Sequence, residues 1–221
     1  MIVELVGLPG VGKTSLAETV CNHRQRVRVA RTPYFRNPAD VPFYILHTIK
    51  LLPLILRVSV SKDGGRLSRR DAALMVILDG WRRMLRRQAR RGSSIVLLDE
   101  GPICYLTRLR AWGSAATKSR LFKAWWDETL QQWASTLDMI IQMDTTDGIL
   151  LQRVLSREMW QEVKAMTESE ALEYLADLRK AQNDVVMQIM GWPHSLNWYC
   201  FDTRLHTPEQ IYQQISGLFE P

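Results

Sequence analysis

Residues 7–15 of the chain are Gly-Leu-Pro-Gly-Val-Gly-Lys-Thr-Ser, and they follow directly on the apolar run Met1–Val6. The spacing G-x-x-x-x-G-K-T is that of a phosphate-binding loop. Its glycines allow backbone angles that a Cβ would hinder, so the N–H groups of the loop can point inward at an anion. The apolar run predicts a buried parallel strand, and a helix that begins near Lys13 adds its positive N-terminal end.

The loop residues predict a nucleotide site with ATP and Mg²⁺ as cofactors. Lys13 can reach the β- and γ-phosphates, and the hydroxyl of Thr14 can serve as a ligand of Mg²⁺. We expect the phosphates to be surrounded by a continuous set of loop residues, namely Gly7, Pro9, Gly10, Val11, Gly12, Lys13, Thr14 and Ser15.

A second signal of the same kind lies at residues 95–100. The apolar run Ile95–Leu98 predicts a strand, and it ends in Asp99 and Glu100. An acid at the end of such a strand faces the Mg²⁺ beside the phosphate loop, so we expect Asp99 to act on the metal, through water. Glu100 could polarise an attacking group, bind a substrate or form a structural ion pair.

Composition limits the class of protein. The 221 residues carry a net charge of +6 and three scattered cysteines without metal spacing, Cys21, Cys104 and Cys200. We expect these cysteines to be small buried side chains. Their number and spacing do not suggest a disulfide framework, and no secretory leader fits before residue 7, so we expect a reduced, cytoplasmic protein. The positive charge suits an anionic ligand, although we expect no specific nucleic-acid partner.

Apolar strand patterns alternate with helical patterns along the whole chain, which predicts one α/β domain over residues 1–221. Such alternation is typical of a parallel sheet covered by helices on both faces, in three layers. The expected strands are 1–6, 27–30, 95–98, 137–143 and 198–201, and the longer helices are 14–22, 68–91, 114–135 and 168–190. Thr167 and Thr207 precede helix-starting patterns as caps.

Two stretches could contact a partner. The apolar residues 42–60 predict a helix interrupted at Pro53 that is buried, or that covers an apolar ligand, a membrane or a protein; its charged residues argue against a transmembrane span. Residues 82–91 carry six arginines on a predicted helix, as a solvated basic face or as a surface for an anionic partner. The tryptophan-bearing helix 114–135 could serve the core or a homodimer.

In their order along the chain, these features resemble the P-loop kinases of the thymidylate kinase, nucleoside monophosphate kinase and deoxynucleoside kinase group. Further matching features are Arg153-x-x-x-Arg157 after a strand that ends near Asp144, and Asp202-Thr203 followed by Thr207-Pro208-Glu209. The resemblance implies the strand order 2-3-1-4-5 and a mobile lid over about 153–168. It also implies that Arg153 and Arg157 stabilise the charge of the transferred phosphoryl group, and that residues 202–207 lie near the adenine.

The acceptor side departs from the family. Asp99 and Glu100 are followed by Gly101-Pro102, without the arginine that grips substrate in these kinases, and Arg31 and Arg108 are candidates to replace it. The predicted function is transfer of the γ-phosphoryl group of ATP to a small acceptor, with a nucleoside or nucleotide implied by the resemblance. The alternatives are a regulatory ATPase acting on a protein or membrane partner, and an interaction protein on a kinase-like fold.

Overall fold

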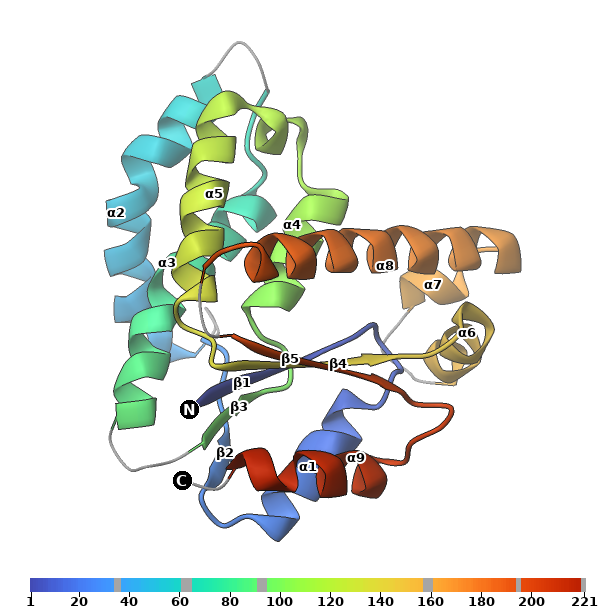
Figure 1. Cartoon of the computed structure of the whole chain (residues 1–221). Helices are drawn as coiled ribbons and strands as arrows, with labels where there is room; N and C mark the ends of the chain where they lie inside the picture. Colours follow the sequence, from blue (N-terminus) through green and yellow to red (C-terminus); the bar gives the residue numbers. More distant parts are fainter. Residues whose placement is uncertain (34–36, 61–64, 91–94, 157–160, 194–195, 220–221) are drawn as a thin grey trace.

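Five parallel strands form the centre of the molecule, in the order β2-β3-β1-β4-β5 (Figure 1). The computed structural model describes residues 1–33, 37–60, 65–90, 95–156, 161–193 and 196–219. The strands are β1 (Ile2–Val6), β2 (Val27–Val29), β3 (Ile95–Leu98), β4 (Met139–Asp144) and β5 (Asn197–Asp202). The predicted α/β class and strand order are confirmed, and the first and third strands are neighbours, as the placement of Asp99 beside the loop requires.

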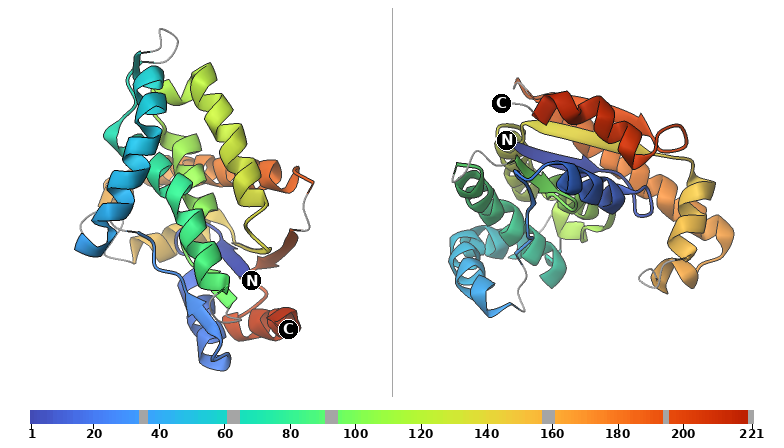
Figure 2. Two further views of the ribbon diagram at one scale, coloured as in Figure 1. Left: turned by 90° about the vertical axis from the view of Figure 1, so that its left-hand side faces the viewer. Right: turned by 90° about the horizontal axis from the view of Figure 1, so that it is seen from below.

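Helices cover both faces of this sheet, as Figures 1 and 2 show. One face carries α1 (Lys13–His23) and α9 (Pro208–Ile215). The other carries α3 (Arg69–Arg90), α4 (Pro102–Trp112), α5 (Arg120–Ala134) and α8 (Glu168–Met190). Each face has its own hydrophobic cluster, because successive residues of β1 point to opposite sides: Ile2 and Val6 join one cluster, and Val3 and Leu5 the other.

Local sequence signals set several helix boundaries. Thr167 and Glu170 form a capping box at the start of α8, and Thr207 and Gln210 form one at the start of α9. The helix expected over residues 114–135 is divided, because the Ser119 side chain caps a new helix, α5, after a short 3₁₀ turn, η2 (Ala115–Lys118). The remaining short elements are η1 (Pro38–Asp40), α6 (Asp147–Leu155), α7 (Gln161–Lys164) and η3 (Ser216–Phe219).

The tryptophans expected in the core are buried there. Trp125, Trp126 and Trp133 all belong to the cluster between the sheet and α3, α5 and α8. The expectation for the cysteines is wrong at Cys200, which is exposed because it lies on the edge strand β5. Cys21 and Cys104 are partly buried, and all three thiols are free.

Helix α2 (Val41–Val60) corrects the expectation of a buried helix. Only His47, Leu51 and Val58 are buried, because α2 lies outside the other helices and packs on α3 and α5 with one side. Its opposite side exposes a row of large apolar residues, namely Val41, Ile45, Leu46, Ile49, Leu52, Leu56 and Val60. By length and composition alone, residues 38–60 are also long and apolar enough to cross a membrane.

Candidate active site

The phosphate loop connects the end of β1 to the start of α1. Gly7, Gly10 and Gly12 all have positive φ, of 156°, 87° and 106°, so the predicted need for glycine at these positions is met in the backbone. Gly12 is the residue that precedes α1, in the left-handed conformation. The Lys13 ammonium donates hydrogen bonds to the carbonyl oxygens of Gly7 at 2.7 Å and Leu8 at 3.2 Å, so its charge lies against the loop.

Thr14 and Asp99, the two residues predicted to act on Mg²⁺, are in direct contact. The Thr14 hydroxyl donates to Oδ2 of Asp99 at 2.9 Å. The other carboxylate oxygen, Oδ1, is buried and has no hydrogen-bond partner among the described residues. Oxygen donors of this kind suit Mg²⁺, which uses one or two protein ligands together with substrate phosphates. The described residues hold no cluster of three or more His, Cys, Asp or Glu side chains that would suggest another type of metal site.

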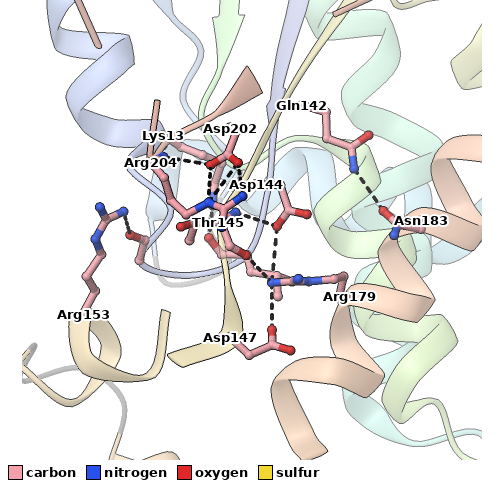
Figure 3. A network of polar contacts seen from close by, with 12 residues as sticks. Lys13, Gln142, Asp144, Thr145, Asp147, Arg153, Arg179, Asn183, Asp202 and Arg204 are labelled. Carbon is pink, nitrogen blue, oxygen red and sulfur yellow. Dashed lines mark hydrogen bonds and ion pairs between the residues drawn. The ribbon is translucent and has the colours of Figure 1, made fainter. Parts of the chain in front are cut away.

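A cavity of about 440 Å³, here called the β5 cavity, opens between the loop and the segment after β5. Arg153 enters it from α6, and its Nη1 donates to the carbonyl oxygen of Gly10 at 3.2 Å (Figure 3). The lining combines loop, α6 and post-β5 residues: Gly10, Val11, Gly12, Ser15, Met143, Arg153, Thr203, Arg204, Leu205, His206, Thr207, Pro208 and Ile211.

Arg204 lies at the wall of this cavity and pairs with Asp202. Its guanidinium forms a fork with both carboxylate oxygens of Asp202, with Nε at 3.0 Å and 2.9 Å from them. Hydrogen bonds from the Arg204 side chain and backbone lower the pKa of Asp202 to about 2, so the pair is ionised throughout the neutral range. A planar cation in a two-point contact with a carboxylate therefore lies at the cavity wall.

Behind this pair, one arginine joins α8 to the end of β4 and the start of α6 (Figure 3). Arg179 Nη2 lies 3.3 Å from Asp144, 2.8 Å from Asp147 and 2.7 Å from the carbonyl oxygen of Thr145. Because Asp147 is the first residue of α6, the contact orients the helix that carries Arg153.

A second cavity, of about 150 Å³, lies on the other side of the loop and is here called the α4 cavity. It combines the loop with side chains of α4 and α8: Gly7, Leu8, Pro9, Gly10, Gly12, Lys13, Thr14, Asp99, Glu100, Cys104, Thr107, Arg108, Trp112, Leu178 and Gln182. Arg108 lies 3.6 Å from Glu100 and over the ring of Tyr105. Burial raises the pKa of the Cys104 thiol to about 11, so this thiol is neutral near pH 7.

A buried carboxyl group positions α4. Glu4, in the middle of β1, is fully buried, and its Oε1 accepts from the backbone N–H of Ile103 at 2.8 Å and of Cys104 at 3.4 Å. These are N–H groups of the first turn of α4, which have no partner within the helix. Burial raises the pKa of Glu4 well above its ordinary value, against the lowering effect of these bonds and of Lys13.

The structure brings most of the predicted site residues together. The loop residues 7–15, Asp99, Glu100, Arg108 and Arg153 all line one or both cavities, Ser15 at the β5 cavity and Pro9 at the α4 cavity. Arg31 does not belong to the described lining of either cavity. It pairs instead with Asp40 at 2.6 Å, because η1 brings that buried carboxylate close to the end of β2. Arg157 lies outside the described residues.

Several lining residues were missed by the sequence prediction. Cys104, Thr107 and Trp112 follow the spacing of one helix face in α4, and this periodicity next to Glu100 could have pointed to them. Leu178 and Gln182 come from α8, about 80 residues after Asp99 and Glu100 in the chain, and no local pattern links them to the loop.

Comparisons with known proteins place the fold. Neither a protein-family model nor a curated protein matches the sequence. Among solved structures, deoxyadenosine kinase from M. mycoides with bound dATP has a TM-score of 0.57 at 14% identity, with 100% of each chain covered. Thymidylate kinase from Candida albicans has a TM-score of 0.56 at 13% identity, covering 98% of this chain and 89% of the other. The likeness shows a fold of the P-loop nucleoside and nucleotide kinase type.

Proposed function

We propose that the protein is an ATP-dependent phosphotransferase that moves the γ-phosphoryl group to a small acceptor, a nucleoside or a nucleotide. The observation that carries the proposal is the presence of two cavities on opposite sides of one phosphate loop, sharing Gly10 and Gly12. A transferase needs room for a donor and an acceptor that meet at the phosphate, whereas hydrolysis needs room only for a water molecule.

ATP would occupy the β5 cavity, with its phosphates over the loop. The segment 203–208 supplies the wall for the base, with Arg204 offering a flat cationic face. Lys13 and Arg153 stabilise negative charge on the transferred group, which is the main demand of phosphoryl transfer. The Thr14 hydroxyl and the Asp99 carboxylate would hold Mg²⁺, which neutralises charge on the β- and γ-phosphates.

The acceptor would occupy the α4 cavity. Its nucleophilic oxygen attacks the γ-phosphorus, the bond to the bridging oxygen of ATP breaks, and ADP leaves with that oxygen. In this proposal Glu100 accepts a proton from an acceptor hydroxyl, and Arg108 orients this carboxylate and binds the acceptor; the 3.6 Å contact between Arg108 and Glu100 supports this pairing of roles. The deoxyadenosine kinase structures, one with bound dATP and one with the products dCMP and dCDP, support a nucleoside or nucleotide as the acceptor class.

The test is direct detection of phosphorylated product by mass spectrometry. Purified protein is incubated with Mg²⁺-ATP and pools of nucleosides, nucleoside monophosphates and sugars, with Lys13→Ala as the inactive control. A nucleoside or nucleotide product that is absent with Lys13→Ala is the expected result. Release of free phosphate without any labelled acceptor would contradict the proposal and favour the ATPase.

A pair of variants on α4 tests the acceptor site separately from the donor site. Arg108→Gln should raise the KM for the acceptor about tenfold or more and leave the KM for ATP nearly unchanged, because a buried polar contact to substrate is lost. The matched control is Arg110→Gln, since Arg110 lies on the same helix but pairs with Asp184 away from the α4 cavity. An equal effect of both substitutions would contradict the assignment of Arg108.

A further inference from the structure

We propose that the outer face of α2, together with the arginine stripe of α3, docks on an anionic phospholipid surface. The α2 face is defined by Val41, Ile45, Ile49, Leu52, Leu56 and Val60, which recur at spacings of three and four residues and so lie along one side of the helix. All are at least 42% exposed, and no described element covers them. The face runs the full length of a 20-residue helix.

The opposite side of α2 is the one that packs into the protein, so the α2 face points outward. His47, Leu51 and Val58 point into the protein and are buried. His47 and Lys50 both bind Asp79 of α3, at 2.8 Å and 2.6 Å, so the helix is fastened on its inner side and at one edge. A fastened helix whose apolar side faces outward is suited to lie flat in a membrane interface.

The positive charge of α2 and α3 favours an anionic surface over a neutral one. Helix α2 contains no aspartate or glutamate, and the side chains in it that can carry a positive charge are His47, Lys50 and Arg57. Beyond Asp79, the same side of α3 continues at helical spacing with arginines only, namely Arg82, Arg83, Arg86, Arg87 and Arg90. Both α2 and the second half of α3 face the viewer in the left panel of Figure 2.

The arginines are close enough to repel one another. Burial lowers the pKa of Arg82, and repulsion by Arg86 and Arg83 contributes to the same shift, although Asp79 and Glu128 attract the guanidinium. Asp79 is already engaged by Lys50 and His47. A second copy of the chain on this face would bring positive charges together. Anionic phospholipid headgroups would instead place negative charges beside these arginines.

The test is co-sedimentation with vesicles of phosphatidylcholine, with or without phosphatidylglycerol. We expect the wild type to bind the anionic vesicles, to bind the neutral ones at least about tenfold less, and to lose binding as salt rises. Ile49→Glu should reduce binding about tenfold or more. Its matched control is Met187→Glu on α8, because the two side chains are 64% and 63% exposed.

A second variant separates charge from apolar contact. Arg83→Gln with Arg87→Gln should weaken binding to anionic vesicles, whereas Arg120→Gln on α5 should not. Retained nucleotide binding by each variant shows that the fold is intact. Absence of vesicle binding by the wild type, or equal effects of Ile49→Glu and Met187→Glu, would overturn the proposal. A wild-type dimer that Ile49→Glu converts to monomer, without vesicle binding, would assign the face to a second copy instead.

Discussion

The carboxyl group of Glu4 occupies the space that a Cβ at Gly101 would require. The two residues are almost a hundred positions apart, but parallel pairing of β1 with β3 places the turn after β3 directly against the β1 side chain. The same carboxyl group binds the first N–H groups of α4. Glycine at position 101 is therefore required by a close approach between two elements that build the α4 cavity.

Replacing Gly101 with alanine should destabilise the protein by about 1–3 kcal/mol, because the neighbouring backbone or Glu4 must move. Denaturation in urea measures this change in the free energy of unfolding. The control is Gly148→Ala, since a Cβ at Gly148 meets nothing within 4 Å and alanine favours a helix by about 0.5–1 kcal/mol. A similar loss in both variants would contradict the role given to Glu4.

The stability of the protein should depend on the titration of Glu4. Because burial raises its pKa above 4.5, the folded state keeps a proton that the unfolded chain has already lost. The free energy of unfolding should therefore fall as the pH rises from about 4.5 toward the raised pKa. Glu4→Gln cannot lose a proton, so its stability relative to wild type should increase over this interval and then become constant.

Urea denaturation of both proteins between about pH 4 and pH 8 measures this difference. A difference that stays the same across the whole range would show that Glu4 does not titrate in it.

The contact between Thr14 and Asp99 predicts a specific dependence on Mg²⁺. Asp99→Asn should raise the Mg²⁺ concentration for half-maximal turnover by about tenfold or more, since a neutral amide is a weaker partner for the ion and its water. Glu100→Gln is the matched control, because it removes the neighbouring charge without removing the group that contacts Thr14. Glu100→Gln should lower turnover and leave the Mg²⁺ dependence nearly unchanged. If Glu100→Gln raised the Mg²⁺ requirement and Asp99→Asn did not, Glu100 and not Asp99 would be the residue that acts on the metal.

The pair formed by Asp202 and Arg204 predicts an effect on ATP binding alone. Arg204→Ala should weaken ATP about two- to fivefold, the effect expected of a cation stacked on a planar base at a partly exposed site. Titration calorimetry with ATP, and separately with inorganic triphosphate, provides the comparison. Loss of affinity for triphosphate by the same factor would show that Arg204 contacts the phosphates and not the base.

Helix caps and the phosphate loop could be predicted well because they depend on neighbours in sequence. The capping boxes that start with Thr167 and Thr207 need only the next three residues, and the backbone angles of Gly7, Gly10 and Gly12 need only the absence of a Cβ. The strand order was implied by the family resemblance and is confirmed in the structure.

Predictions that required knowledge of distant partners were less successful. The apolar composition of α2 indicated burial, but how much of a helix is covered depends on the neighbours it meets, and the described elements contact α2 on one side only. The pair of Arg31 with Asp40 depends on η1 and was not indicated by the sequence, and a role of Arg31 toward a substrate stays a prediction. The roles of Arg153 and the lid over 153–168, and a cytoplasmic location, stay predictions.

The sequence by itself determined a strand, a phosphate loop and a helix in direct succession, because each depends on periodicity and glycine geometry within about ten residues. The tertiary structure alone decided which side chains surround the loop. Parallel pairing carried Asp99 to Thr14, and the packing of α4 and α8 carried Gln182 to the α4 cavity. Contacts of this kind are set by how helices pack on a sheet, and that packing depends on side chains scattered over the whole chain.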